Sequence, residues 1–501
     1  MRKLFDDHKT DLLVFGGLIL AYFLTRLPRL DLIPIFTDEA IYLRWSQIMA
    51  YDASLRYLPL VDGKPPLFMW ATSIVLKLFP SLDPLLSLRL TSVGGGLFSM
   101  AGIIFTSYVF FRNKRISLLA ALLYLVVPFT FFYDRFGLAD SLLAAFGVWS
   151  LGLGALLVQS IRLDVALILG TAIGLGLLTK TPALFFLVTL PLQLLLFNFK
   201  TSGWKIRLVK LFLLFLLVVI ISQAIFSILR LFPLFHMISQ KNLEFIVTPA
   251  EFLARPFEFF FNNLKTLLTW EVGYLTAPVA LTIAFAFLRG QAVKQNLILA
   301  AIFLIHLLYM STFNKSIFPR FLLTFTPGLL VLAAVGLDQM STRLRPSLLV
   351  LVFVLVLALP VYTDFKLLTD PPTAPIPDGD SKQYINAWPA GYGVKEIRQF
   401  LARESSQYPK VTIGTEGTFG LMPYALQLYQ KDYPNVEIKD YWPLGETVPA
   451  ALLEASANHP TYFIIYQRPD VPPNWKLRLV ASFQQGRSND YLRLYQILPE
   501  D

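Results

Sequence analysis

Residues 208–229, LVKLFLLFLLVVIISQAIFSIL, decide the fold of this chain, because the run contains a single charged side chain, Lys210. A helix needs about 20 apolar residues to cross the hydrocarbon core of a bilayer, and this run is long enough. The 501-residue chain is 55% hydrophobic and only 15% charged, with a mean hydropathy of +0.58. A soluble domain cannot bury so much apolar surface in one core, so the sequence predicts an integral membrane protein.

Ten further apolar runs bring the predicted number of transmembrane helices to eleven. The runs lie at 11–29, 86–111, 116–133, 138–159, 163–179, 182–198, 208–229, 273–288, 296–312, 320–337 and 346–362. No small-residue cleavage site precedes Arg26, so we interpret the first run as an uncleaved anchor. The predicted fold class is therefore an α-helical, polytopic membrane protein.

If the N-terminus is cytoplasmic, every segment on the inner side of the membrane contains basic residues. They are Arg2, Lys3 and Lys9; Arg112, Lys114 and Arg115; Arg162; Lys200, Lys205, Arg207 and Lys210; Arg289 and Lys294; Arg343 and Arg345. Cytoplasmic loops carry such an excess, which predicts a cytoplasmic N-terminus in the plasma (inner) membrane. The basic residues behind the net charge of +10 therefore set the orientation of the chain in the bilayer, and we exclude nucleic acid as a partner. The absence of cysteine excludes disulfides and thiolate metal sites.

Three segments fall on the predicted outer face. The connections 30–85 and 231–271 are too polar to span the bilayer, and they place aromatic residues at helical spacing beside charges, which is typical of helices lying in the interface. The membrane domain is expected to end at residue 364, and the proline-rich segment 365–385 to be a linker. Residues 386–501 are mostly polar and predict a soluble, extracytoplasmic domain.

This C-terminal domain alternates helical and strand patterns. Helices are expected at 394–404, 419–430 and 448–458, and strands at 410–414, 436–441, 461–466, 476–483 and 491–498. Such alternation predicts a small parallel sheet covered by helices, with an antiparallel pair at its end. Gly414, Gly417 and Gly420 follow a strand, where backbone amides can cradle a phosphate, but their spacing favours a turn-forming role.

An acidic pair, Asp38 and Glu39, follows the first apolar run and is preceded by Thr37. Carboxylates beside a bilayer are costly unless they face water or a polar site, so the pair indicates function. Adjacent residues on a helix point about 100° apart, so one carboxylate can act on a substrate while the other holds the loop. Asp38 is the candidate general base; the alternative is that the pair caps a helix that begins at Ala40.

Four cations on the predicted outer face are candidate binding residues. Lys64 lies in Asp62-Gly63-Lys64-Pro65-Pro66, where two prolines fix the backbone. Arg135 stands at the outer end of one span, and Lys315 and Arg320 precede another. Converging ammonium and guanidinium groups can hold the phosphate of a lipid whose chain lies among the helices. The alternative for each cation is contact with ordinary lipid headgroups.

Metal and hydrolase signatures are absent from the sequence. His8, His236, His306 and His459 are isolated, with no partner at metal-ligand spacing; His306 in an apolar run is expected to be packed, and His236 is the one placed to join the site. There is no Ser-His-Asp pattern, P-loop or internal repeat, which argues against a hydrolase, an ATP-driven pump and a secondary transporter.

The order of five short motifs resembles that of the GT-C glycosyltransferases. The motifs are Thr37-Asp38-Glu39, Lys64-Pro65-Pro66-Leu67, Asp134-Arg135-Phe136-Gly137-Leu138-Ala139-Asp140, Leu178-Thr179-Lys180-Thr181-Pro182 and Phe318-Pro319-Arg320-Phe321. The nearest branch contains the protein O-mannosyltransferases and the lipid A aminoarabinose transferase, and the likeness covers roughly residues 10–340.

The resemblance implies an inverting transfer of a sugar from a polyprenyl-phosphate donor to a lipid, glycan or protein acceptor. It implies that Asp38 is the base, that Lys64, Arg135 and Arg320 hold the carrier phosphate, and that Glu39, Asp140 and Lys180 support the site. Gly63 stands where the aminoarabinose branch has an acidic metal-binding residue, so no metal ligand is assigned and a divalent metal stays an open possibility.

The sequence leaves two alternative functions open. A non-enzymatic translocase or binding scaffold for lipid-linked sugars would use the same cations without needing a base. An oligosaccharide ligase or polymerase with a diphosphate carrier would need additional metal-binding carboxylates, which the sequence does not display.

Overall fold

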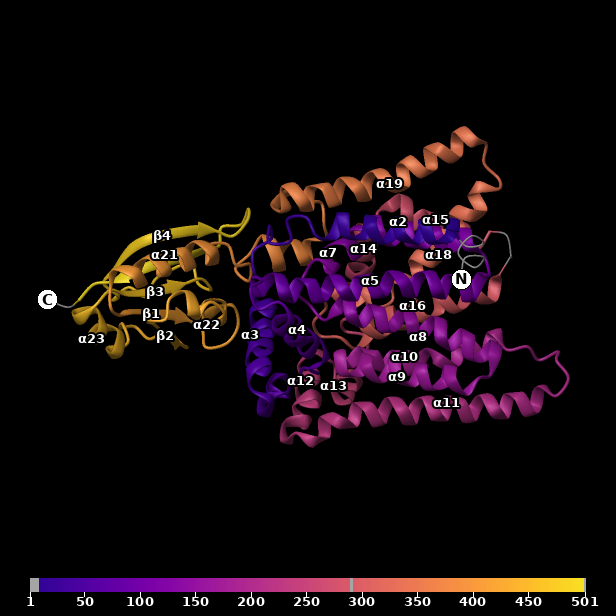
Figure 1. The fold of residues 1–501 in the computed structure, drawn as a ribbon, viewed down its shortest axis with the longest axis horizontal. Helices are drawn as coiled ribbons and strands as arrows, with labels where there is room; N and C mark the ends of the chain where they lie inside the picture. Colours follow the sequence, from indigo (N-terminus) through magenta and orange to yellow (C-terminus); the bar gives the residue numbers. More distant parts are fainter. Residues whose placement is uncertain (1–8, 289–291, 500–501) are drawn as a thin grey trace.

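The computed structural model describes residues 9–288 and 292–499, with side chains from residue 13 onward. A bundle of helices occupies the larger part of the molecule, and a small sheet with its own helices lies beyond one end of it (Figure 1). The predicted cytoplasmic charges Arg2, Lys3 and Arg289 lie outside the described residues.

The bundle contains long, short and broken helices. Its α-helices are α2 (Lys9–Arg26), α3 (Thr37–Tyr51), α4 (Leu67–Leu78), α5 (Pro84–Phe111), α6 (Lys114–Val126), α7 (Pro128–Asp134), α8 (Asp140–Ser160), α9 (Leu163–Thr179), α10 (Leu184–Thr189), α11 (Trp204–Phe226), α12 (Met237–Phe245), α13 (Pro249–Ala254), α14 (Phe260–Leu275), α15 (Ala277–Phe285), α16 (Val293–Phe313), α17 (Arg320–Leu323), α18 (Thr326–Ser341) and α19 (Pro346–Thr369). The 3-10 turns are η1 (Ala53–Leu55), η2 (Leu58–Asp62), η3 (Thr181–Ala183), η4 (Leu190–Leu196), η5 (Ser227–Leu231), η6 (Pro233–His236) and η7 (Pro371–Thr373).

Fewer of these helices meet the length and hydropathy of a membrane span than the sequence predicted. In the described part of the chain, five single helices do so, or up to seven when two bent pairs are each counted as one span. The pairs are α6 with α7, bent by 62°, and α14 with α15, bent by 98°. Prolines near the N-termini of α7 and α15 lack the backbone donor that a continuous helix needs. The number of eleven spans stays a prediction.

Close helix packing rests on small residues. α5 and α8 cross where Gly102 faces Val148 and Trp149, and a Cβ on Gly102 would lie 2.7 Å from the nearest Val148 carbon. Thr106 on α5 donates a hydrogen bond of 2.7 Å to the carbonyl of Val148. Apolar lipid drives helices together weakly, so close contact of small residues and such hydrogen bonds stabilise the pair.

The C-terminal region forms one five-stranded sheet in the order β2-β1-β3-β5-β4. Its elements are α20 (Asp378–Asp380), the π-helical turn η8 (Ser381–Ile385), α21 (Val394–Gln407), β1 (Val411–Glu416), α22 (Leu421–Gln427), η9 (Gln430–Asp432), β2 (Val436–Tyr441), α23 (Ala450–Asn458), β3 (Thr461–Ile465), β4 (Leu477–Gln484) and β5 (Tyr491–Ile497). β1 pairs in parallel with β2 and β3, with Thr412 opposite Thr461, while β5 is antiparallel to β3 and β4. The predicted parallel sheet with an antiparallel end is confirmed.

Two glycines of the first strand-to-helix turn adopt backbone conformations that favour glycine. Gly417 and Gly420 have φ angles of 96° and 120°, which residues other than glycine rarely adopt. A Cβ on Gly420 would lie 3.3 Å from the methyl group of Thr37, at the start of α3. The turn-forming interpretation therefore accounts for these two glycines, and the turn brings the sheet close to the acidic motif.

Residues 365–385, the segment expected to be a linker, pack against the helical bundle. α19 continues to Thr369, past the predicted end of the membrane domain at residue 364. Asp380 and Tyr384 are then fully buried, and Asp380 accepts hydrogen bonds from Tyr133 (2.6 Å) and Tyr274. Burial raises the pKa of Asp380 to about 7.

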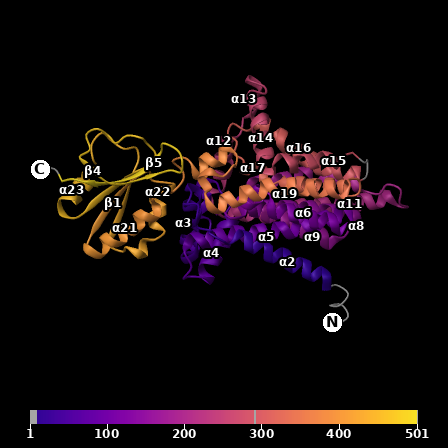
Figure 2. The ribbon, with the colours of Figure 1, turned by 90° about the horizontal axis from the view of Figure 1, so that it is seen from above.

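The sheet domain packs on the end of the bundle that carries α3, α4 and α12 (Figures 1 and 2). Thr37 donates to the carbonyl of Pro389 at 3.1 Å, and Gln47 donates to that of Leu428 at 3.1 Å. The turn before α11 lies at the opposite end (Figure 1). The segments predicted to share the outer face thus lie together at one end of the bundle.

Candidate active site

A cavity of about 410 Å³ opens at the end of the bundle that faces the sheet domain. Five of the eight predicted site residues line it: Asp38, Lys64, Asp140, Lys180 and Arg320. They come from five segments that are distant in sequence, which is the convergence that the predicted topology required. Apolar and aromatic side chains, among them Leu184, Phe185 and Tyr309, line much of the remaining wall.

Asp38 is held in the cavity between two cations. Its Oδ2 accepts a hydrogen bond of 2.8 Å from Nη1 of Arg320, and its Oδ1 lies 4.0 Å from Nζ of Lys64. Burial alone would raise the pKa of this carboxyl, but the charges of Lys64 and Arg320 outweigh burial and lower the pKa below its ordinary value. Asp38 is thus ionised, the form that can accept a proton.

Lys64 owes its position to the turn before it. Gly63 ends η2 in the left-handed conformation, with φ 64°, and the Lys64 amide donates to the carbonyl of Pro59 at 3.1 Å. The ammonium lies 3.0 Å from Asp62 and 5.1 Å from the centre of the Tyr42 ring. Burial opposes the charged form, but Tyr42, Asp38 and Asp62 outweigh it and raise the pKa of Lys64 above its ordinary value.

A second ion pair, Asp140 with Lys180, stands on another wall. Asp140 begins α8, where a carboxylate interacts favourably with the helix dipole, and Lys180 follows the last residue of α9. Lys180 Nζ donates to Asp140 at 2.8 Å and lies 5.4 Å from the centre of the Phe321 ring, one residue beyond Arg320. Lys180 and Arg320 therefore each have a carboxylate partner, Asp140 and Asp38 respectively.

Glu39 does not face the cavity, so it is the member of the acidic pair that holds the loop, and it is not a catalytic group. The side chain is fully buried, and Arg89 donates to its two oxygens at 2.8 and 2.7 Å. The backbone amides of Phe36 and Gly137 donate to it as well, at 3.0 and 2.7 Å. With four donors its acceptor capacity is used, and its contact with Phe36 caps α3, which begins at Thr37 rather than at Ala40. Glu39 positions Asp38.

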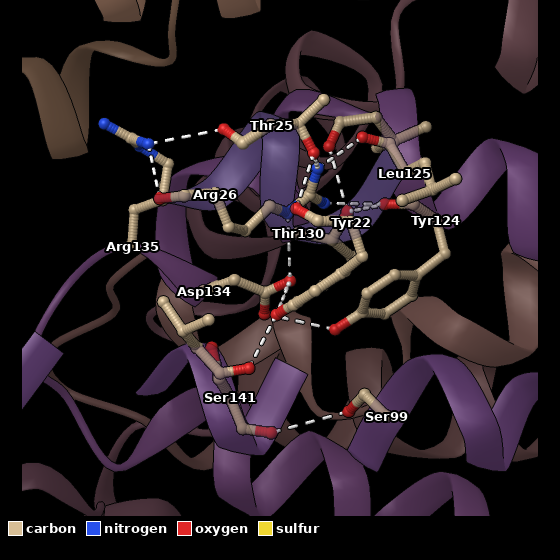
Figure 3. A network of polar contacts seen from close by, with 12 residues as sticks. Tyr22, Thr25, Arg26, Ser99, Tyr124, Leu125, Thr130, Asp134, Arg135 and Ser141 are labelled. Carbon is tan, nitrogen blue, oxygen red and sulfur yellow. Dashed lines mark hydrogen bonds and ion pairs between the residues drawn. The ribbon is translucent and has the colours of Figure 1, made fainter. Parts of the chain in front are cut away.

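Arg135 is also turned away from the cavity, which corrects its predicted phosphate contact. Its guanidinium donates to the carbonyls of Thr25 and Arg26 at 3.3 and 2.6 Å and to that of Arg29 at 3.1 Å. Carbonyls at the end of a helix lack partners within the helix, and Arg135 supplies donors for those of α2 (Figure 3). The preceding Asp134 is buried and paired with Arg26 at 3.5 Å.

Lys315 is the third predicted residue outside the cavity lining. Its ammonium pairs at 2.7 Å with Glu251, the third residue of α13, and its backbone amide donates to Phe245 at 2.8 Å. The adjacent Asn314 does line the cavity. Lys315 therefore ties the segment after α16 to the connection between α12 and α13.

Three further charged residues, which were not predicted from the sequence, belong to the cavity lining. Asp62, Lys241 and Glu244 line the cavity, and the latter two lie on α12. Asp62 belongs to the Asp62-Gly63-Lys64 motif, which gave a usable signal, but α12 carries no motif. His236 does not line the cavity; His306 does, and its Nε2 donates to the carbonyl of Phe321 at 3.1 Å, as expected for a packed histidine.

The cavity carboxylates do not fit a resident divalent metal. Lys64 lies between Asp38 and Asp62, at the place where a shared cation would have to bind. Between residues 9 and 288 and between 292 and 499, no three His, Asp or Glu side chains are grouped so that they could hold a metal ion. We derive no step through a metal.

Fold and site together define a polytopic membrane protein with a cation-rich cavity at one end of its helical bundle. The family model for dolichyl-phosphate-mannose-protein mannosyltransferases matches residues 63–226. No curated protein sequence matches the chain significantly.

Solved structures show the same fold at low sequence identity. ArnT from Cupriavidus metallidurans in the apo state aligns with a TM-score of 0.56 and 16% identity, and bound to undecaprenyl phosphate with 0.60 and 15%, each over 98% of both chains. The Archaeoglobus fulgidus oligosaccharyltransferase aligns with 0.51 and 15%, over 91% of this chain and 69% of that chain. The resemblance to the GT-C glycosyltransferases of the mannosyltransferase and ArnT branch is confirmed.

Proposed function

We propose that the protein is an inverting membrane glycosyltransferase that moves a sugar from a polyprenyl-phosphate carrier to an acceptor hydroxyl or amine at the outer face of the plasma membrane. The mannosyltransferase family match and the ArnT-like fold support a transferase that depends on a polyprenyl phosphate. One observation carries the proposal: a carboxylate, that of Asp38, lies between Arg320 and Lys64 in a cavity at the end of the bundle.

The phosphate of the carrier is assigned to Arg320, Lys180 and Lys64. Arg320 uses Nη1 for Asp38, while its Nε is buried without a hydrogen-bond partner, so part of the guanidinium is available for an anion. When the bond between the sugar and the phosphate breaks, the leaving phosphate gains negative charge. Cations that are already fixed in the cavity stabilise this charge in the transition state.

Asp38 then serves as the general base. It takes the proton of the acceptor hydroxyl while that oxygen attacks the anomeric carbon from the side opposite the phosphate, so the configuration at that carbon inverts. The apolar wall around Leu184 and Phe185 suits the first isoprene units of the carrier. The acceptor is a lipid, a glycan or a protein.

Asp38→Asn tests the assignment of the base. Purified protein in proteoliposomes is given a labelled polyprenyl-phosphate sugar and a mixture of cell-envelope acceptors. We expect the variant to lose transfer by a factor of about 10² to 10⁴, with carrier binding retained. Asp440→Asn, on the exposed surface of the sheet domain, is the matched control. Unchanged transfer by Asp38→Asn would remove Asp38 from the mechanism, and donor flipping without any transfer by the wild type would favour the scaffold alternative.

A further inference from the structure

Six charged side chains of the cavity form one row in which the signs alternate. Arg320 contacts Asp38 at 2.8 Å, Asp38 lies 4.0 Å from Lys64, and Lys64 lies 3.0 Å from Asp62. The row continues onto α12, where Lys241 lies 3.7 Å from Asp62 and 3.0 Å from Glu244. Three cations and three carboxylates thus balance, and each inner carboxylate stands between two cations.

Lys241 occupies the space beside Gly63. A Cβ on Gly63 would lie 2.8 Å from Cβ of Lys241 and 2.6 Å from the carbonyl oxygen of Met237, both on α12. No side chain fits at position 63 while α12 lies where it does. The stem of Lys241 fills the place that an acidic side chain at this position would take, and its ammonium reaches the neighbouring Asp62 instead.

We propose that Lys241 is a further phosphate-binding residue and that the ammonium groups of Lys64 and Lys241 make this site independent of a divalent metal. The inference rests on the proposed function, because it assigns charges to the carrier phosphate of that reaction. A divalent ion between Asp38 and Asp62 would have to displace Lys64 and would still face Lys241 and Arg320. A phosphate, in contrast, finds a cation at one end of the row and two more along it.

The position of Lys241 suits the capture of an incoming headgroup. Its side chain is 34% exposed, whereas that of Arg320 is 13% exposed, so Lys241 lies nearer to the solvent. α12 is also anchored on both sides of the cavity: it packs on Gly63, and after it Val247 donates to the carbonyl of Phe313 at 2.7 Å. An anion that enters past Lys241 therefore meets Lys64 next and Arg320 last.

Metal binding is tested without any substrate. Purified wild-type protein, treated with a chelator and dialysed, is titrated with Mn²⁺ and the free ion is measured by electron paramagnetic resonance. We expect no stoichiometric site in the micromolar range. Stoichiometric Mn²⁺ binding that Asp38→Asn or Asp62→Asn abolishes would overturn the inference, and the proposed transfer reaction would still stand.

Phosphate binding tests the part assigned to Lys241. The probe is a polyprenyl monophosphate in mixed micelles, titrated against chelator-treated protein. We expect the wild type to bind it, Lys241→Gln to bind it about 5- to 20-fold more weakly, and Lys241→Arg to recover most of the affinity. Lys265→Gln, on the exposed side of α14 and outside the cavity, is the control and is expected to match the wild type. Equal affinities of Lys241→Gln and the control would overturn the role of Lys241; failure of the wild type to bind the probe would instead overturn the proposed function.

Discussion

Two adjacent carboxylates, Asp38 and Glu39, should respond in opposite ways to the same chemical change. In Glu39→Gln one carboxylate oxygen becomes an amide group, which cannot accept the hydrogen bonds of Phe36 and Arg89. Both partners of the ion pair are buried, with side-chain exposures of 0% for Glu39 and 1% for Arg89. Leaving one member of a buried ion pair without its partner costs about 3–5 kcal/mol, so we expect a loss of that size in the free energy of unfolding.

The same change at Asp38 removes charge but little stability. Asp38 and Arg320 retain 18% and 13% exposure at the cavity, and the amide oxygen that remains in Asp38→Asn can still accept from Arg320. We expect the free energy of unfolding to change by about 1 kcal/mol or less, since pairs that contact solvent contribute little. Sugar transfer per folded molecule, in contrast, should fall far more in Asp38→Asn than in Glu39→Gln.

Equilibrium unfolding in mixed micelles, followed by tryptophan fluorescence, gives both stabilities. The transfer assay on the same preparations gives both activities. If Glu39→Gln unfolds within about 0.5 kcal/mol of the wild type, the four-donor arrangement around Glu39 is not what holds α3. If Asp38→Asn is the less stable of the two, the assignment of structural and chemical parts to this pair is reversed.

Three further outcomes are expected. Arg320→Gln removes a cation that keeps the pKa of Asp38 below its ordinary value, so the acid limb of kcat/KM should move to higher pH than in the wild type; an unmoved limb would separate Asp38 from Arg320. Burial raises the pKa of Asp380 to about 7, so the contribution of Asp380 to stability should be full below about pH 4 and lost as pH rises through 7. In unfolding experiments, Asp380→Asn should flatten this decline. A pH profile identical to that of the wild type would contradict the assignment. Because the chain has no cysteine, Ser81→Cys and Ser202→Cys each carry one thiol, and in intact cells an impermeant maleimide should label the first and not the second; the reverse pattern would put the cavity in the cytoplasm.

The sheet domain could be predicted from the sequence almost element by element. Its strands are short, its helices amphipathic, and turn residues separate them, so local pattern and tertiary structure agree. The helices of the membrane domain could be predicted less completely. Apolar runs identify helices, yet breaks such as the 98° bend before α15 depend on tertiary packing around a single proline, and hydropathy does not show whether a bent pair crosses the membrane once.

Charged residues that lie in a motif could be predicted from the sequence. Whether their side chains point into the cavity or away from it could not. Asp38, Lys64, Asp140, Lys180 and Arg320 all line the cavity. Glu39 and Arg135 have equally distinctive motifs, but their side chains satisfy buried backbone groups, which a single sequence cannot distinguish from substrate contacts. Lys241 lies on α12, in a connection whose helical pattern contains no motif, and only the packing of α12 on Gly63 brings it to the cavity.

The ion pair between Arg320 and Asp38 gives the proposed reaction an order. While the cavity contains no donor substrate, the carboxylate of Asp38 is paired with the guanidinium of Arg320, the same group that is proposed to bind the phosphate. A carrier phosphate bound to the free part of the same guanidinium places a second negative charge beside Asp38, so binding of the donor weakens the pair and raises the pKa of the carboxylate toward that of an effective base. The acceptor proton is therefore removed readily only after the leaving group is in place. The wild type and Arg320→Gln should consequently differ most in the absence of donor. A carboxyl-directed reagent should modify Asp38 slowly in the wild type, faster in Arg320→Gln, and faster in the wild type once a polyprenyl monophosphate is added. Equal rates in all three cases would show that the phosphate and the base do not share the guanidinium.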